Sequence, residues 1–456
     1  MGIGSWLSAY VQRNLLAFFI KVEILVGLIG GCSAALLFSL FEHVYSFHLL
    51  LYFVVAIIGI LVGIEIPLLL RILKDRLEFK ELVSRVFTFD YIGALFASIL
   101  FPLVLVPHLG LIRSAFLFGI FNSAVAIWVL YAIKEKIPNR TQHKFLAILV
   151  LLLLVFGFIY SDNIVNSSES AAYPGAIIYA KSTPYQRIVL TRQKDDLRLF
   201  LNSNLQFSSL DEYRYHEALV HPIMAALKHP KKILIIGGGD GLALREVLKY
   251  DDVQQVVMVD LDAAMTKLFS SNKMLTQLNQ NSLSSPKLKI YNEDAFLWLR
   301  NLSQNKTETK FDAIIIDVPD PSNFSVGKLY SLTFFKLLRN IINKDALIVV
   351  QSTSPLVARK SFWCVHNTMQ AAGYRTTPYH AYVPSFGEWG FIIASNTAYQ
   401  APQSYLGNLQ FINSATFTEM LHFPKDMEHL DTKIQSLDDQ ALIHYFDEEW
   451  SKYLIY

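Results

Sequence analysis

Five long apolar stretches in the first third of the chain constrain its fold more than any other feature. They run from Ile24 to Phe41, Leu49 to Leu70, Tyr91 to Pro107, Ser114 to Ile133 and Phe145 to Tyr160. Each approaches the ~20 residues that an α-helix needs to cross a bilayer. The helices of a buried domain would keep a polar stripe, whereas Leu149 to Phe156 is apolar all round. A cleaved signal peptide does not fit, because the stretches recur. We therefore predict a transmembrane helical region of about five spans over residues 1–162.

Two basic loops separate these stretches and bear on orientation. One contains Arg71, Lys74, Arg76, Lys80 and Arg85, and the other contains Lys134, Lys136, Arg140 and Lys144. Lys and Arg favour the cytoplasmic side, so this count places both loops there. One further span would then bring the rest of the chain out on the opposite side. We predict a multi-pass protein of the cell (inner) membrane, with the side of the C-terminal half left open.

A different pattern begins after residue 162. Residues 163–175 are polar and serine-rich, which is typical of a linker. Short alternating runs then predict a small antiparallel β subdomain over residues 176–210. Within residues 211–400, apolar runs alternate with helical stretches, which predicts an α/β Rossmann-like, doubly wound domain of the methyltransferase type. These runs are Lys232 to Ile236, Val256 to Asp260, Lys287 to Tyr291, Ala313 to Asp317 and Ala346 to Gln351. Residues 401–456 form a C-terminal tail with an amphipathic helix near its end.

The charge balance and the cysteines argue against two kinds of partner. The chain has 40 Lys and Arg against 38 Asp and Glu, for a net charge of +2. No basic field is available to attract nucleic acid. The two cysteines, Cys32 and Cys364, lie in different halves and have no metal-ligand spacing. We predict neither a nucleic-acid partner nor a metal site.

A glycine-rich loop follows the first strand of the predicted α/β domain. The run Ile233 to Ile236 leads into Gly237, Gly238, Gly239, Asp240 and Gly241, and a helical stretch comes next. Such a loop lets the backbone approach a ligand at the start of a helix. One strand later, Asp260 stands where this fold holds the two hydroxyls of a ribose. The loop and this carboxylate together predict a ligand of the adenosine type.

Further acidic residues end the strands that follow. Because ligands of open α/β sheets bind beyond the carboxyl ends of the strands, the acids at these ends should converge on one site. They are Asp240, Asp260, Asp294, Asp317 and Asp320. Acids also end strands as turn formers or helix caps, which is the interpretation we favour for Asp262.

From Tyr185 to Ser395 the chain resembles the spermidine synthases, the polyamine aminopropyltransferases. The resemblance rests on Tyr185-Gln186, Leu205-Gln206, the run from Asp211 to Glu217, the glycine loop with Arg245-Glu246 after it, Asp294-Ala295, the block from Asp317 to Pro321, and Leu329-Tyr330-Ser331. The N-terminal half is similar to the membrane portion of the long bacterial members of this family. In those members an extra pair of spans comes first, which implies a late start or a truncated chain here.

The resemblance implies transfer of the aminopropyl group of decarboxylated S-adenosylmethionine to putrescine or a related diamine. The products would be spermidine and 5′-methylthioadenosine, and no cofactor besides this co-substrate would be needed. Carboxylates suit these ligands, because the donor and the acceptor both carry ammonium groups. The resemblance assigns Asp317 as the catalytic base; Gln186, Gly237, Gly239, Asp260, Asp294 and Ala295 to the donor; and His216, Asp240, Asp320, Tyr215 and Tyr330 to the amine. Assembly into a homo-oligomer is left open.

Two other functions are compatible with the same fold. A methyltransferase that uses intact S-adenosylmethionine would share the glycine loop and the ribose carboxylate. Asp240 would, however, repel the carboxylate of the intact donor and attract the ammonium group of the decarboxylated one. A non-catalytic membrane sensor or transporter of polyamines would need no base, and the presence of Asp317 argues against it. Without the resemblance, His216 would be interpreted as a packing or capping histidine.

Overall fold

The structure is a computed structural model that describes residues 1–41, 47–74, 78–133, 137–304 and 310–453. The chain divides into two compact units. The first comprises Met1–Ile177 and Ser182–Pro184, and the second comprises Ile178–Lys181 and Tyr185–Tyr456.

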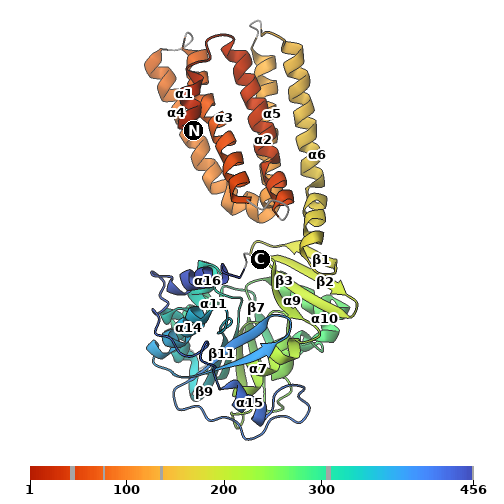
Figure 1. The fold of residues 1–456 in the computed structure, drawn as a ribbon, viewed down its shortest axis with the longest axis vertical. Coiled ribbons are helices and arrows are strands. Elements are labelled where there is room, and N and C mark those ends of the chain that lie inside the picture. Colours follow the sequence, from red (N-terminus) through yellow and green to blue (C-terminus); the bar gives the residue numbers. More distant parts are fainter. Residues whose placement is uncertain (42–46, 75–77, 134–136, 305–309, 454–456) are drawn as a thin grey trace. The chain divides into compact units, whose positions relative to one another are not determined.

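The first unit is helical (Figure 1). Its elements are α1 (Gly2–Ser8), α2 (Leu15–Leu40), α3 (Phe47–Leu73), α4 (Phe79–Leu100), the π-helical turn η1 (Phe101–Leu105), α5 (Val106–Ala132) and α6 (Arg140–Ala172). In the described part of the chain, four helical stretches are long and apolar enough to cross a membrane: Leu15–Leu40, Phe47–Leu73, Phe79–Ala132 and Arg140–Asp162. The third holds two of the predicted apolar stretches, separated by a break at Gly110, whose φ is 77°; η1 lies within the first of the two. The predicted stretches therefore coincide with helices α2 to α6 and the turn η1.

Small residues bring two of these helices close together. Gly27 and Gly31 of α2 face Gly119 of α5, and a Cβ atom on Gly119 would lie 2.8 Å from the Cα atom of Gly31. A Cβ atom on Gly27 would lie 3.0 Å from the carbonyl oxygen of Gly119. Glycines permit this approach of two helix backbones, which larger side chains would prevent.

The predicted linker, residues 163–175, differs from expectation because α6 continues to Ala172. Between residues 161 and 172 the sequence has no glycine or proline, the two residues that end helices most strongly. Pro174 and Gly175 follow, and Gly175 has a φ of 88°. Serine and asparagine alone therefore do not end this helix.

The predicted small sheet follows the helices, and most of it belongs to the second unit. Its strands are β1 (Ala176–Ser182), β2 (Arg187–Gln193), β3 (Asp196–Leu201) and β4 (Asn204–Ser208), in the order β1-β2-β3-β4. The strands β2, β3 and β4 pair antiparallel. The turn between β3 and β4 consists of Asn202 and Ser203, with φ angles of 50° and 69°. Positive φ at both positions matches the twist of a tight hairpin.

The main sheet confirms the predicted α/β fold and adds two strands. It contains β5 (Lys232–Gly237), β6 (Gln255–Val259), β7 (Leu288–Tyr291), β8 (Phe311–Asp317), β9 (Ile342–Gln351), β10 (Arg375–Val383) and β11 (Gly387–Ser395). Their order is β10-β11-β9-β8-β5-β6-β7. The five predicted strands are parallel, whereas β10 and β11 extend the sheet antiparallel from β9. The strand order reverses between β5 and β8, which is where ligands bind in such folds.

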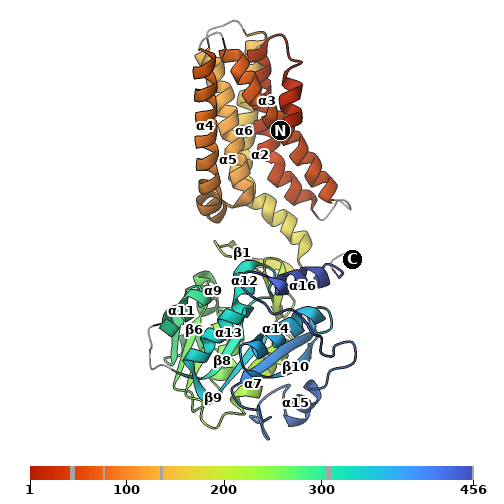
Figure 2. The ribbon, with the colours of Figure 1, turned by 90° about the vertical axis from the view of Figure 1, so that its left-hand side faces the viewer.

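Helices cover both faces of this sheet (Figure 2). They are α7 (Glu212–Met224), α8 (Leu242–Val247), α9 (Ala263–Ser271), α10 (Lys273–Leu278), α11 (Ala295–Gln304), α12 (Phe324–Gly327), α13 (Leu332–Leu338), α14 (Arg359–Ala371), α15 (Ser414–Met420) and α16 (Ala441–Trp450). Alternate side chains of β5 enter opposite cores. Ile233 and Ile235 pack with α7 to α10, and Leu234 and Ile236 pack with α11, α13 and α14. This two-sided core is the doubly wound arrangement that the sequence predicts.

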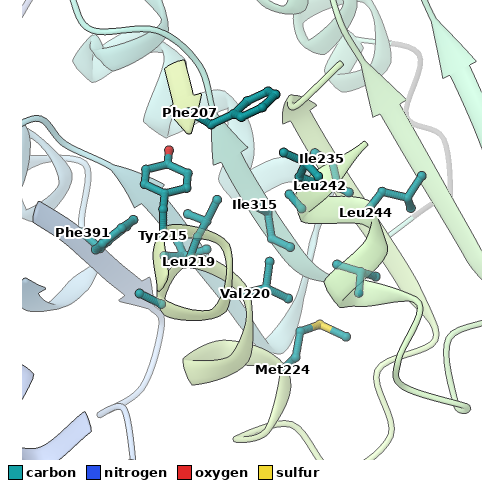
Figure 3. Packing of buried hydrophobic residues seen from close by; sticks show 14 of the residues in the cluster. Phe207, Tyr215, Leu219, Val220, Met224, Ile235, Leu242, Leu244, Ile315 and Phe391 are labelled. Atoms are coloured by element: carbon teal, nitrogen blue, oxygen red, sulfur yellow. The ribbon is translucent and has the colours of Figure 1, made fainter. Parts of the chain in front are cut away.

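Helix α7 is anchored against the sheet by its apolar face. Leu219, Val220 and Met224 pack in the same buried cluster as Ile235 and Ile315 (Figure 3). Complete burial of each such side chain contributes about 1.5–3 kcal/mol. The helix is therefore a rigid support for the residues of its first turns, which reach the carboxyl edge of the sheet.

Candidate active site

The glycine loop and the end of β8 meet at the point where the strand order reverses. Gly237 pairs with Asp317 in the parallel register of β5 and β8. The amide of Gly238 donates a hydrogen bond of 3.0 Å to the carbonyl oxygen of Asp317. Gly237 has a φ of 81°, and a Cβ atom there would lie 2.0 Å from that carbonyl oxygen. Only glycine fits this position, and its close approach sets where Asp317 lies.

A Gly237→Ala substitution is therefore expected to lower the free energy of unfolding by roughly 2–4 kcal/mol, because it combines a positive φ with a backbone clash. The matched control is Gly407→Ala, since a Cβ atom on Gly407 would meet nothing within 4 Å. Thermal unfolding of the two variants tests this. Equal melting temperatures would contradict the role of Gly237.

Asp317 is half-buried and lies at the centre of the site. The hydroxyl of Tyr215, from α7, donates a hydrogen bond of 2.7 Å to Oδ1 of Asp317. Burial raises the pKa of Asp317, although the charge of His216 and the Tyr215 hydrogen bond oppose this effect. Burial and the neighbouring Asp317 likewise raise the pKa of Tyr215 well above its ordinary value. A carboxylate with a raised pKa is suited to accept a proton during a reaction.

Asp320 follows in the loop after β8 and has one oxygen without a partner. The hydroxyl of Thr353 donates a hydrogen bond of 3.3 Å to Oδ2 of Asp320. Oδ1 is buried and finds no hydrogen-bond partner among the described residues. Burial raises the pKa of Asp320 to about 7, and the nearby polar side chains of Thr353 and Gln351 only partly oppose this effect. A buried acceptor without a donor is costly, so this oxygen is placed to accept a hydrogen bond from a ligand.

His216 is held by a buried ion-pair network. Its Nδ1 atom lies 2.7 Å from Oε2 of Glu212, and the guanidinium of Arg245 contacts both oxygens of Glu212 at 2.7 and 2.9 Å. Burial would lower the pKa of His216, but the hydrogen bond and the charge of Glu212 outweigh it and raise the pKa to about 9. The ring lies within electrostatic range of Asp240 and Asp317. His216 is thus a protonated member of the site at neutral pH.

One carboxylate lies in the glycine loop and another lies beside it. Asp240 accepts a hydrogen bond of 2.9 Å from the amide of Leu242, and burial raises its pKa to about 6. Asp260, after β6, accepts hydrogen bonds from the amides of Gly239 at 3.1 Å and Asp262 at 2.9 Å. Burial raises the pKa of Asp260 to about 6 as well. A Cβ atom on Gly239 would lie 2.6 Å from Oδ2 of Asp260, so a larger residue there would displace this carboxylate.

The other predicted donor-binding residues lie at the same edge but have other contacts. Asp294 caps α11 by accepting hydrogen bonds from Phe296 and Leu297, and its second oxygen pairs with Lys328. Ala295 is the first residue of α11. The side-chain amide of Gln186 donates a hydrogen bond of 3.0 Å to Oδ2 of Asp262, which lies two residues after Asp260. Asp262 also caps α9, as the sequence predicts.

Three residues of this edge were not predicted from the sequence: Gln351, Thr353 and Trp389. The amide nitrogen of Gln351 donates to the hydroxyl of Tyr330 at 2.8 Å, and its oxygen accepts from the indole of Trp389 at 3.1 Å. Gln351 ends β9, so the rule of strand carboxyl ends could have found it. Trp389 lies on strand β11, which was not predicted. Thr353 can be identified as a site residue only from its contacts in the structure.

The arrangement can bind a cation and remove a proton from it. Asp240, Asp317 and Asp320 are half-buried carboxylates at one edge, and the network of Glu212 holds His216 among them. Ammonium groups are the ligands that such carboxylates favour. Among the described residues no group of three or more His, Cys, Asp or Glu side chains could hold a metal ion.

Comparison with known proteins agrees with this chemistry. The family model of the spermine/spermidine synthase domain matches residues 212–404. The chain is 49% identical over 454 residues to a polyamine aminopropyltransferase of Leptospira interrogans. This match covers 100% of this chain and 90% of that protein. It is 49% identical over 459 residues to polyamine aminopropyltransferase 2 of Ralstonia nicotianae, and this match covers 99% of this chain and 89% of that protein. These similarities include the helical unit and the tail as well as the α/β domain.

A solved structure is similar to part of this chain. It is a spermidine synthase in complex with the transition state analogue AdoDATO, with a TM-score of 0.50 and 25% sequence identity. The match covers 55% of this chain and 88% of that chain.

Proposed function

The chain belongs to the spermine/spermidine synthase family, and from that premise we propose how its own residues carry out aminopropyl transfer. It is an aminopropyltransferase that uses decarboxylated S-adenosylmethionine and a polyamine acceptor. The amine nitrogen attacks the aminopropyl carbon next to sulfur, the carbon–sulfur bond breaks, and its electron pair returns to sulfur. The products are 5′-methylthioadenosine and the extended polyamine, and one proton leaves the attacking nitrogen.

Asp317 is the base in this proposal. An amine attacks only when it is deprotonated, so a carboxylate must orient the amine and take its proton. The position of Asp317 at the reversal of strand order, with its raised pKa and its hydrogen bond from Tyr215, supports this role.

The amine is bound by Asp320 and Asp240, beside Tyr215 and Tyr330. His216 belongs to the same site, but as an imidazolium it cannot accept a hydrogen bond from an ammonium group; its charge offsets part of the negative charge of Asp240 and Asp317. The observation that carries this assignment is the buried, unpartnered Oδ1 atom of Asp320. An ammonium group would supply the missing donor and a compensating charge. Putrescine is the proposed acceptor, since a diamine can place one amino group near Asp320 while the other reacts at Asp317.

The adenosine part of the donor lies along the glycine loop. Gly237 and Gly239 permit its close approach, and Asp260 accepts hydrogen bonds from the ribose hydroxyls. Asp260 would then exchange its hydrogen bonds from Gly239 and Asp262 for contacts with the ligand. Gln186, Asp294 and Ala295 complete the donor side; Asp294 keeps the α11 cap and turns its other oxygen from Lys328 to the adenine amino group.

Turnover by the full-length, detergent-purified chain tests this function. We expect methylthioadenosine from decarboxylated S-adenosylmethionine with putrescine, and a panel of diamines would rank the acceptors. Intact S-adenosylmethionine serves as the control for a methyltransferase. Methyl transfer from the intact donor, or tight nucleoside binding without any turnover, would contradict the proposal.

The amine KM is expected to fall as pH rises from about 6 to 8. The pKa of Asp320 is raised to about 7, so this carboxyl is largely neutral below that pH and negative above it. An ionised carboxylate binds an ammonium group more tightly, so the KM for putrescine should drop about three- to tenfold over this range. Steady-state kinetics at saturating donor measure it. In an Asp320→Asn variant this dependence should disappear, and its persistence would assign the titration to another group.

We also propose that the helical unit spans the cell membrane. Its outer surface supports this, because large apolar side chains are exposed along the helices, including Phe89 at 74% and Phe145 at 68%. Contiguous apolar surface of this kind is unstable in water. The protein should therefore stay in the membrane fraction after alkaline carbonate extraction, and release into the soluble fraction would contradict the proposal. Assembly into a homo-oligomer stays a prediction.

A further inference from the structure

The C-terminal tail ends in a helix that is built into the second unit. Helix α16 lies beyond residues 212–404, to which the family model corresponds. Leu442 of α16 is fully buried in the core with α13 and α14. Glu449 accepts hydrogen bonds from the amides of Lys360 at 2.8 Å and Ser361 at 3.1 Å, at the start of α14. Burial on one side and capping on the other fix α16 in place.

The same tail packs on the segment that carries the site residues Asp320 and Tyr330. The side-chain amide of Gln435 donates a hydrogen bond of 3.3 Å to the carbonyl oxygen of Gly327, and the amide of Leu332 donates one of 2.9 Å to the carbonyl oxygen of Gln435. Ile443 of α16 lies so close to Gly327 that a Cβ atom there would be 2.8 Å from its Cδ1 atom. The tail therefore covers and supports the segment between β8 and α13.

A chain of two hydrogen bonds leads from the last residue of α16 to Asp320. The indole nitrogen of Trp450 lies 3.4 Å from the hydroxyl oxygen of Thr353, which lies 3.3 Å from Oδ2 of Asp320. An indole N–H can only donate, so it occupies a lone pair of the Thr353 hydroxyl. The single hydroxyl proton then points to Asp320. Thr353 has a φ of 55°, an unfavourable backbone angle that is found preferentially at functional sites.

We infer that Trp450 is a positioning residue of the amine site, which acts on Asp320 through the hydroxyl of Thr353. By holding Oδ2 of Asp320 on Thr353, it directs the unpartnered Oδ1 atom to the substrate ammonium group. The inference rests on the proposed role of Asp320. It makes the C-terminal helix a part of the active site that acts on the acceptor and not on the donor.

Steady-state kinetics of the full-length chain test the inference with Trp450→Phe. We expect the KM for putrescine to rise about three- to tenfold, as for loss of one hydrogen bond, with the donor KM changed by less than about twofold. The matched control is Trp363→Phe. Trp363 also donates its indole N–H to the tail, at 3.0 Å to the carbonyl oxygen of Met427, but this contact has no link to Asp320. Thr353→Val, which removes the relay hydroxyl, should reproduce the effect on the amine KM if Trp450→Phe proves unstable.

A double variant separates this inference from the proposed function. In an Asp320→Asn background, Trp450→Phe should change the amine KM little further, because the relay has lost its target. If Asp320→Asn alone raises the amine KM but Trp450→Phe behaves like Trp363→Phe, the inference fails and the role of Asp320 stands. If Asp320→Asn leaves the amine KM unchanged, the role of Asp320 fails and the inference with it.

Discussion

Replacing Asp317 with asparagine is expected to lower kcat by about 10²- to 10⁴-fold, the range for loss of a general base. The asparagine amide has the same shape, and its oxygen can still accept the hydrogen bond from Tyr215, but it cannot take the proton of the amine. Donor binding should remain within a few-fold, because Asp317 acts on the acceptor. Initial rates of methylthioadenosine formation measure the first effect, and calorimetric titration with decarboxylated S-adenosylmethionine measures the second.

The same substitution should leave stability unchanged or raise it, opposite in sign to its effect on activity. Burial raises the pKa of Asp317 above its value in the unfolded chain. Such a group contributes stability below the unfolded pKa, and the contribution is lost as pH rises through the folded pKa. Ionisation of Asp317 in the folded chain therefore costs stability, and asparagine, which does not ionise, removes this cost. The control is Asp345→Asn, an exposed carboxylate on β9, which should change neither property. If the Asp317→Asn variant keeps the wild-type kcat, Asp317 is not the general base.

Much of the site could be predicted because it follows from strand ends. Asp240, Asp260 and Asp317 come directly after apolar runs, and parallel strands bring their carboxyl ends to one edge. The hydrogen bond between Gly238 and Asp317 is a direct result of this pairing. The antiparallel strands β10 and β11 were missed, because their pairing with β9 depends on contacts between distant segments.

Other contacts had a local signal that was not used. Glu212 and His216 are four residues apart on α7, the spacing at which helical side chains meet. That spacing could have assigned Glu212 as the partner of His216, whereas its ion pair with Arg245 bridges two helices. The link from Trp450 to Asp320 has no local signal, since it joins residues that are far apart in the sequence through Thr353.

In the helical unit, the apolar stretches predicted the helices but not their ends. A hydrophobic stretch shows where exposure of apolar side chains to water would be unfavourable. A helix continues beyond that stretch until residues such as glycine or proline interrupt its backbone hydrogen bonding. Helix α6 therefore runs past Tyr160 to Ala172, and the break in the stretch Phe79–Ala132 falls at Gly110.

Glu212→Gln should be the most destabilising of the conservative substitutions at the site. Its carboxylate joins His216 and Arg245 in a buried network, and loss of one buried partner typically costs about 3–5 kcal/mol because a charge stays uncompensated. Arg245 also contacts Glu246 at 2.8 Å, so the lower part of that range is expected. Activity should fall as well, since His216 loses the group that holds it protonated and oriented.

The pH dependence distinguishes this network from ordinary packing. The pKa of His216 is raised to about 9 in the folded chain, so its contribution to stability is complete below about 6.5 and is lost as pH rises through 9. The pKa of Glu212 is lowered; burial would raise it, but the hydrogen bonds from His216 and Arg245 prevail, so its contribution is lost in acid. The difference in melting temperature between the wild type and Glu212→Gln should therefore be largest near neutral pH and shrink above pH 9 and in acid. Glu419→Gln, at an exposed position on α15, serves as the control. A difference that stays constant across this range would show that Glu212 contributes shape and not charge.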